Sequence, residues 1–323
     1  MGRYLIRRVL FMGLVLFVVS LLTFLIFVKL PAANPAIRAV GRATTPANIR
    51  AATHALGLDR PVWVQYWRFA KGLIPWPGFF LNRQVYFSYT NFVPVSSQIY
   101  SRLPVTATLA LGAAGVWLLI GIPIGILSAV RRRSIADRAA MVFALIGVSA
   151  PVFWLAYLFL FIFWFKLRWA PPSGFTIGMT IPRAVVTGRF VLPWVALSLT
   201  FAAFYARMVR GNLIETMGED YIRTARAKGL SEKRVIYKHG LRAALTPVVT
   251  MLGLDVGILL GGAFITETVF ALPGLGQYAV QSIFANDFPS VMGVTVFAAF
   301  FIALANLIVD VVYAFLDPRV RYA

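Results

Sequence analysis

Long apolar runs separated by short polar segments are the feature that most restricts how this chain can fold. A membrane-spanning helix needs about 20 mainly apolar residues. Four runs reach or approach this length without a charge, and two more carry isolated acids. The runs are Val9–Val28, Leu103–Val130, Ala139–Phe165, Phe190–Ala206, Ala243–Phe270 and Ser290–Phe315. Because 60% of the 323 residues are apolar and 13% are charged, an ordinary soluble domain is excluded. We expect an all-α polytopic membrane protein with six transmembrane helices.

The first run has two interpretations. Basic residues precede it, and the small residues Pro31-Ala32-Ala33 follow it, as they would in a cleaved signal peptide. Its apolar core of about 20 residues exceeds the roughly 7–15 residues that are usual in a signal peptide. We therefore expect a retained helix.

The distribution of basic residues predicts the orientation. The formal net charge is +20, and the short segment 131–138 carries four Lys or Arg whereas 271–289 carries none. Short cytoplasmic loops are enriched in Lys and Arg, which places 131–138 inside and both termini in the cytoplasm. We interpret the positive charge as topology determinants and contacts to the lipid membrane. No nucleic-acid-binding motif accompanies it, so nucleic acid is not an expected partner.

Three regions follow from this order of spans. Residues 1–30 form the N-terminal transmembrane helix, and 31–102 form a sizeable extracytoplasmic segment. Residues 103–323 form a core domain with five transmembrane helices and a polar loop at 209–245.

The extracytoplasmic segment contains two helical patterns. Thr45–Leu56 begins with a capping residue, and Pro61–Leu73 is amphipathic and rich in aromatic residues. The second pattern fits a helix near the membrane surface, although such aromatics also occur at interfaces without a special role. In the core, Pro123 and Pro151 are expected to kink their helices, which neighbouring helices can tolerate.

Several kinds of chemistry are excluded by composition. The chain has no cysteine, so disulfides, thiolate metal sites and cysteine nucleophiles are absent. Its two histidines are too few for an imidazole metal cage. No paired carboxylates and no nucleophile–base set stand out, so we expect neither a catalytic residue nor a metal site.

The polar segment Gly218–Leu245 is more elaborate than a simple connection requires. Asp220 is a candidate N-cap for a short helix Tyr221–Lys228, and Gly229 is a natural left-handed stop. Ser231 can then cap a second helix that leads into the fifth span. A short helix is marginal alone and needs something to pack against. The segment is therefore either a docking surface for a soluble partner or a solvated amphipathic loop.

One face of this short helix is the proposed contact. Tyr221, Ala225 and Lys228 recur at helical spacing, and the small Ala225 would allow close approach of a partner.

Acidic and amide side chains inside the spans form a second group of candidates. An ionised acid at the centre of a span costs about 2.5–3.5 kcal/mol, so it should face protein or water. The candidates are Asp255, Glu267, Asn306 and Asp310. They could line a water-filled pathway, hold a gate through hydrogen bonds, or simply join helices, and Asp255 is the best pathway candidate.

The polar segment contains the sequence EDYIRTARAKGLS, followed by KHGLRAAL. It resembles the cytoplasmic loop of ATP-binding-cassette (ABC) importer permeases. This sequence is similar to that of the first membrane subunit in the dipeptide and oligopeptide branch of these importers. Only Ala225, Gly229 and Leu241 agree with the general importer signature. Further similar stretches are LDRPVWVQYW, PVFWLAYLFLFIF, APPSG, LPWVALSLTFAAFYARMVRGNLIE, ETVFALPGLG and NLIVDVVYAFLDPR. The chain departs from the branch at Leu81–Val95, which puts the contact of that segment with a substrate-delivering protein in doubt.

The resemblance implies a type I ABC importer permease fold in a bacterial inner membrane. The implied partners are a second permease subunit, two ATPase subunits that bind ATP and Mg²⁺, and an extracytoplasmic substrate-binding protein. This chain has no Gly-rich phosphate loop and should bind no cofactor itself. The residues implied to couple to the ATPase are Glu219, Asp220, Tyr221, Arg223, Ala225, Arg226, Lys228 and Gly229.

The implied cargo is a small peptide. Close relatives of this branch carry nickel chelates, glutathione or oligosaccharides, and the membrane subunit rarely reveals which. An ion-coupled secondary transporter is the alternative outside the family, but no paired half-helix repeat is visible.

Overall fold

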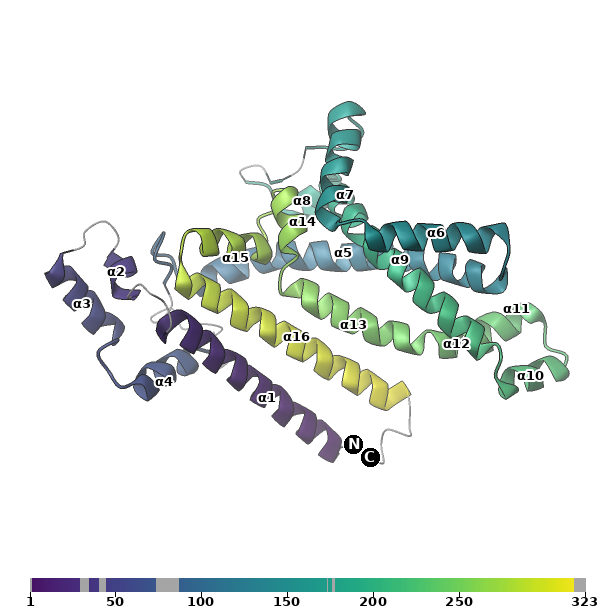
Figure 1. The fold of residues 1–323 in the computed structure, drawn as a ribbon, viewed down its shortest axis with the longest axis horizontal. Helices are drawn as coiled ribbons and strands as arrows, with labels where there is room; N and C mark the ends of the chain where they lie inside the picture. The colour runs from purple at the N-terminus through teal and green to yellow at the C-terminus, as the bar shows by residue number, and fades with distance from the viewer. Residues whose placement is uncertain are drawn as a thin grey trace.

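The computed structural model describes residues 2–29, 35–40, 45–73, 87–172, 174–175 and 178–316, which form a bundle of helices (Figure 1). Within these ranges the only extended pairing is an isolated bridge between Phe87 and Pro94. Four described helices are long and apolar enough to cross a membrane, and the number reaches six if each of two bent pairs is one span. The expected all-α polytopic class is confirmed.

The helices have the following bounds. The N-terminal part contains α1 (Gly2–Phe24, extended by a π-helical turn to Lys29), α2 (Pro35–Val40), α3 (Pro46–Leu56) and α4 (Val62–Leu73). The central part contains α5 (Val95–Val130), α6 (Ile135–Ser149), α7 (Val152–Phe159, extended to Lys166), α8 (Ile181–Val186) and α9 (Val191–Thr216). The last part contains α10 (Asp220–Ala227), α11 (Glu232–Arg234, extended to Gly240), α12 (Leu241–Ala244), α13 (Thr246–Leu260), α14 (Phe264–Val269), α15 (Leu275–Phe284) and α16 (Phe288–Leu316).

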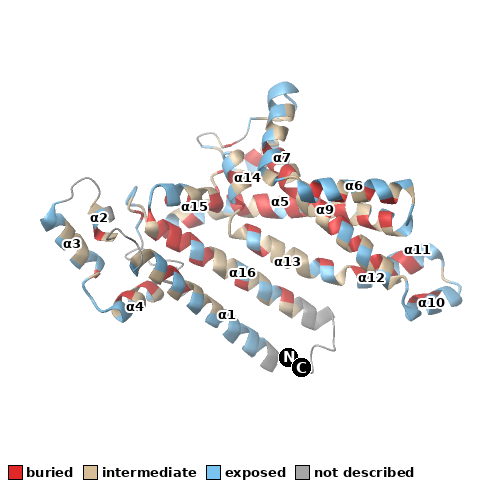
Figure 2. Cartoon of the chain, in the orientation of Figure 1, coloured by how far each residue is buried: buried red, intermediate tan, exposed pale blue. Residues whose placement is uncertain are grey.

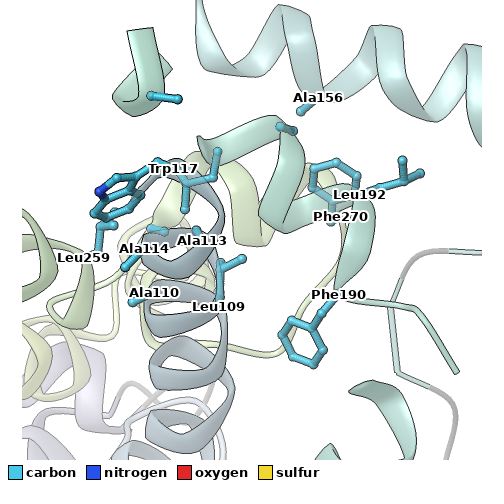
Figure 3. Close-up of a cluster of buried hydrophobic side chains, with 14 of the residues drawn as sticks. Leu109, Ala110, Ala113, Ala114, Trp117, Ala156, Phe190, Leu192, Leu259 and Phe270 are labelled. Atoms are coloured by element: carbon cyan, nitrogen blue, oxygen red, sulfur yellow. The ribbon is translucent and has the colours of Figure 1, made fainter. Parts of the chain in front are cut away.

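The central packing joins α5 to α9. Trp117 on α5 is fully buried and stacks on Phe201 of α9 with ring centroids 4.6 Å apart. At Gly125, a Cβ atom would lie 2.6 Å from the carbonyl oxygen of Ala206, so only glycine permits this approach of the two helices. Figure 3 shows the small α5 residues Ala110, Ala113 and Ala114 on the same side of α5 as Trp117. Small residues at helix contacts are the usual means of close packing in membranes.

A second close contact joins α13 to α16. Cβ atoms at Gly253 and Gly257 would lie 2.2 Å from Val309 and 2.3 Å from Ala305. The spacing of these two glycines is the G-x-x-x-G pattern of close helix packing. On the other side, α1 packs along α16 (Figure 1).

The third predicted span is sharply bent. The α6 and α7 segments meet at an angle of 100°, and α7 stands out from the rest of the bundle (Figure 1). Ala150, which precedes Pro151, is extended, with φ −80° and ψ 123°. A residue before proline avoids the helical conformation, which explains the break. The kink at Pro151 is confirmed, whereas α5 continues through Pro123.

The fifth predicted span, Ala243–Phe270, is not one helix. Its main part α13 ends at Leu260, and α14 is a separate short helix. Gly262 has a φ of +127°, and a Cβ atom there would lie 2.7 Å from the backbone of Gly276. The chain therefore turns at the adjacent glycines Gly261 and Gly262, where we expected a continuous helix.

Both helices predicted between the first and second spans are present. The Thr45 side chain accepts a hydrogen bond from the Asn48 N–H at 3.2 Å and caps α3, which ends at Gly57 in the left-handed conformation. The amphipathic pattern becomes α4. The following span begins at Val95 rather than Leu103. Residues 81–86 of the atypical segment and 317–323 of the C-terminal segment lie outside the described residues.

Many apolar side chains point outward. Figure 2 shows exposed residues along α1 and α6, and these include Leu10 and Ile135. Such surfaces are unstable in water and fit lipid or a partner subunit.

Candidate functional site

The polar segment after α9 folds as predicted, with one change at its start. The helix α10 begins at Asp220, and Glu219 is the extended N-cap residue with φ −69° and ψ 151°. Asp220 is therefore the first helical residue and not the cap. The Glu219 carbonyl oxygen accepts from the N–H groups of Ile222 and Arg223 at 3.1 and 3.3 Å, which begins the hydrogen bonding of the helix, and the Glu219 side chain makes no capping hydrogen bond. Gly229 ends the helix with a φ of +74°, as expected of a left-handed stop.

The inner face of α10 packs against its own chain. Ile222, Ala225 and Val235 form a small buried cluster, and Met217 and Leu230 pack against it. Ala225 is only 7% exposed. Within this chain, the small side chain of Ala225 packs against the helix that follows, so its predicted contact with a partner stays a prediction.

The outer face of α10 is open. Tyr221 is 46% exposed, and Arg223 and Lys228 are also exposed. Partial burial, and then the nearby Glu219 carboxylate, raise the pKa of the Tyr221 hydroxyl. The predicted partner-facing set is thus divided, with Tyr221 and Lys228 outside and Ala225 inside.

Arg226 holds the segment together. Its guanidinium donates two hydrogen bonds to Glu232, at 2.7 and 3.2 Å, and so joins α10 to α11 across the Gly229 turn. These hydrogen bonds raise the pKa of the Arg226 guanidinium. Both residues border a cavity of about 430 Å³ beneath α10, which Arg132 of the α5–α6 turn also lines.

Asp255 lies inside the bundle and has a partner. Its carboxylate accepts a hydrogen bond from the Tyr205 hydroxyl of α9 at 2.7 Å. Tyr205 is fully buried next to Trp117. The acid that we considered the best pathway candidate therefore joins α13 to α9.

Glu267 is buried in α14, where it holds a loop. Its carboxylate accepts hydrogen bonds from Thr106 Oγ1 at 2.8 Å and from the Gln277 N–H at 2.9 Å. A Cβ atom at Gly274 would lie 2.3 Å from this carboxyl group, so the loop wraps tightly around it. The expectation that Glu267 lies at the outer end of the fifth helix is wrong, because that helix ends at Leu260.

Asn306 and Asp310 share a face of α16. They line a cavity of about 450 Å³ between α1, α13 and α16. Asp310 forms an ion pair with Arg8 of α1 at 2.8 Å. The structure does not bring the four polar candidates into one site, since Asp255 and Glu267 have other partners. No cluster of three or more metal-ligating side chains occurs among the described residues.

Comparison with known proteins defines the family. The model of the "binding-protein-dependent transport system inner membrane component" matches residues 121–322, and its N-terminal companion matches residues 1–110. The chain belongs to this family.

The similarity of this permease to its relatives extends over almost its whole length. It is 40% identical over 308 residues to a Brucella abortus protein provisionally named a peptide transport system permease protein, covering 95% of each chain. It is 35% identical over 347 residues to the dipeptide transport system permease protein DppB of Escherichia coli K12, covering 100% of this chain and 99% of the relative.

One solved structure supports the fold of the permease. The methionine ABC transporter MetNI, in an inward-facing conformation, has a chain that matches with a TM-score of 0.55 and 21% identity. The match covers 69% of the permease and 98% of that chain. It confirms the predicted type I importer permease fold.

Sequence reasoning missed a charged cluster at the end of the permease near α10. Asp137, in the first turn of α6, accepts hydrogen bonds from Ser128 Oγ at 2.5 Å and the Arg133 N–H at 2.8 Å. Arg210 of α9 donates two more, at 2.7 and 3.0 Å. The sequence signal was Ser134 followed three residues later by Asp137, a capping pattern before an apolar run.

A second missed cluster lies at the other end of the permease. Asp287 is buried and accepts from Ser88 Oγ at 2.5 Å, the Tyr89 N–H at 2.8 Å and Ser290 Oγ at 2.7 Å. Burial, and then the Asp287 charge, raise the pKa of Tyr89 to about 12. This cluster fastens the segment before α5 to the start of α16. No local pattern marks it, because the partners are far apart in sequence.

Proposed function

We propose that this permease is one of the two membrane subunits of an ATP-driven importer of small peptides. The observation that carries the cargo is the end-to-end match to dipeptide permeases at 35–37% identity. The relatives compared are all named for peptide or dipeptide transport, which favours peptide among the cargoes of this branch.

We also propose that α10 is the coupling helix, through which a separate ATPase subunit moves the permease. Its buried face rests on a core of its own chain, and the Arg226–Glu232 pair fixes the following turn. Its other face presents Tyr221, Arg223 and Lys228. A short helix whose buried face packs against its own chain and whose other face is exposed can transmit a force from a partner without unfolding.

The proposed complex has separate parts for separate tasks. Two ATPase subunits bind ATP and Mg²⁺, a second permease subunit completes the pathway, and an extracytoplasmic binding protein delivers the peptide. The permease has no phosphate-binding loop, so ATP hydrolysis belongs to the ATPase subunits. Both termini and α10 lie in the cytoplasm in this proposal, as the basic turn Arg131-Arg132-Arg133 favours.

Within the membrane, we assign different tasks to the polar candidates. Asp255 and Tyr205 remain pathway candidates, since their pair lies between two central helices. Glu267 positions the loop between α14 and α15 and so supports the gate at that end. Asp310 joins α16 to Arg8 of α1, and Asn306 lines the same cavity one turn away.

Transport by the reconstituted complex tests this function. The permease, its second permease subunit, ATPases and binding protein are placed in lipid vesicles, and uptake of a radiolabelled dipeptide is measured with and without ATP. We expect ATP-dependent uptake that unlabelled di- and tripeptides inhibit. Stronger inhibition by nickel chelates, glutathione or oligosaccharides would contradict the peptide cargo, and uptake driven by an ion gradient without ATP would contradict the mechanism.

A further inference from the structure

The outward face of α4 has no role in the function proposed above. Trp63 is 73% exposed and Trp67 is 54% exposed, and Lys71 is exposed in the same row. These residues are four apart and therefore lie one above the other on the helix. The Lys71 ammonium lies 5.4 Å from the centre of the Trp67 ring. We propose that this face binds the lipid surface of the leaflet at the Lys29 end of α1, so that α4 is a membrane anchor.

The opposite face of α4 determines where this helix lies. The Tyr66 hydroxyl and Ser20 Oγ of α1 are 3.0 Å apart, and the rings of Phe69 and Phe24 are 5.8 Å apart. Tyr66 also contacts Phe17, with ring centroids 6.0 Å apart. These contacts hold α4 directly against a membrane-spanning helix.

The depth of this contact follows from the position of Ser20 in α1. The apolar span extends to Lys29, and Ser20 lies about 13 Å along the helix axis before that residue. One leaflet of the hydrocarbon core is about 15 Å thick. A helix that contacts α1 at this level cannot lie wholly above the membrane. In our proposal, its outward face lies at the boundary between headgroups and acyl chains.

The chemistry of the exposed face suits that boundary. Indole rings prefer the headgroup level because they combine an apolar body with an N–H donor. A lysine beside them can lay its methylene chain along apolar surface and extend its ammonium to a lipid phosphate. On α1, which α4 contacts, the apolar residues Val18 and Leu22 are also exposed, at 43% and 51%.

The neighbouring helix α3 provides a contrast. Its exposed residues include Ala47, Arg50 and His54, and α3 contains no Phe, Tyr or Trp. The Gln65 amide of α4 donates to the carbonyl oxygens of Leu58 and Arg60, at 2.9 and 2.6 Å, and so fixes the connection between the two helices. We therefore expect α3 to face water while α4 contacts lipid.

Single-cysteine labelling tests this inference, and the absence of native cysteine makes it direct. Trp63→Cys, Trp67→Cys and, as the matched control, Ala47→Cys are each labelled with bimane in the full complex. The complexes are placed in nanodiscs of phosphatidylethanolamine and phosphatidylglycerol that contain lipid with a nitroxide near the headgroup. We expect labels at 63 and 67 to lose most of their fluorescence to the nitroxide lipid, and the label at 47 to be quenched by aqueous iodide instead.

Two results would overturn the lipid assignment. Quenching of positions 63 and 67 by iodide would show that α4 faces water. Protection of both positions from iodide and from nitroxide lipid would show that another protein subunit covers α4. Because a cysteine could disturb the contact, the conservative double variant Trp63→Phe/Trp67→Phe provides a second measurement. Brominated lipid should quench a smaller fraction of its native tryptophan emission than in the parent complex, and an unchanged fraction would contradict the inference.

Discussion

Asp137 is the residue at which α5, α6 and α9 meet. Its carboxylate is 7% exposed, and it accepts from Ser128 of α5 and from Arg210 of α9. It also lies in the first turn of α6, where the helix dipole favours a negative charge. Removing one partner of a buried ion pair costs about 3–5 kcal/mol because the remaining charge is unpaired.

We predict that Asp137→Asn and Arg210→Met each destabilise the permease, by about 3 kcal/mol. The double variant Asp137→Asn/Arg210→Met should lose less than the sum of the two, by about 2 kcal/mol, since it leaves no unpaired charge. Heat denaturation of the detergent-solubilised complex, followed by size-exclusion chromatography, measures the three variants. Effects that add fully would show that the pair does not act as a unit.

Other residue-level pairs show what sequence can and cannot reveal. The rule that an acid inside a span needs a partner applies to Asp255, Glu267 and Asp310, each of which is bonded. The identity of the partners could not be predicted, because Tyr205 is 50 residues from Asp255 and Thr106 is 161 residues from Glu267. Such pairs depend on which helices pack against each other in the folded structure.

At the scale of elements, α10 depends on the backbone conformation of one residue. Gly229 has a φ of +74°, and a Cβ atom there would meet nothing within 4 Å. Substitutions at this position therefore act through backbone strain and not through collisions. The left-handed conformation costs an ordinary residue about 1–2 kcal/mol, and asparagine tolerates it best.

We predict that Gly229→Asn, Gly229→Val and Gly229→Pro reduce peptide uptake in that increasing order. Proline should have the largest effect because its ring fixes φ near −65°. ATP hydrolysis should fall less than uptake, so the number of ATP molecules used per peptide rises. Both rates are measured in vesicles at equal permease content.

The matched control for this series is Gly115→Val in α5. Gly115 also has open space around its Cβ position but has a helical backbone, so we expect normal uptake. Equal uptake by Gly229→Pro and the parent would remove α10 from the mechanism.

The helices themselves were largely predictable, and their breaks only partly. Long apolar runs located the spans, and Pro151 revealed the bend after α6. The break at Gly261-Gly262 was missed because the apolar run continues across it. Only the approach of Gly276 explains why the chain turns there, and that contact arises from tertiary structure.

At the scale of the whole molecule, one chain leaves large apolar surfaces uncovered. The projecting α7 exposes Phe153, Trp154 and Tyr157, each at least half exposed. A bent helix that stands out from the bundle (Figure 1) needs lipid or a second subunit around it. The permease is therefore best understood as part of an assembly, in which α10 is the proposed contact with the ATPase.

Crosslinking from α10 in the assembled complex tests that central claim most directly. The cysteine-free chain allows Tyr221→Cys on the exposed face and Ala225→Cys on the buried face of the same helix, each labelled with a short photoactivated crosslinker. We predict that position 221 forms a covalent product with the ATPase subunit and that position 225 does not. A complex that still imports peptide but forms no ATPase product from position 221 would contradict the account.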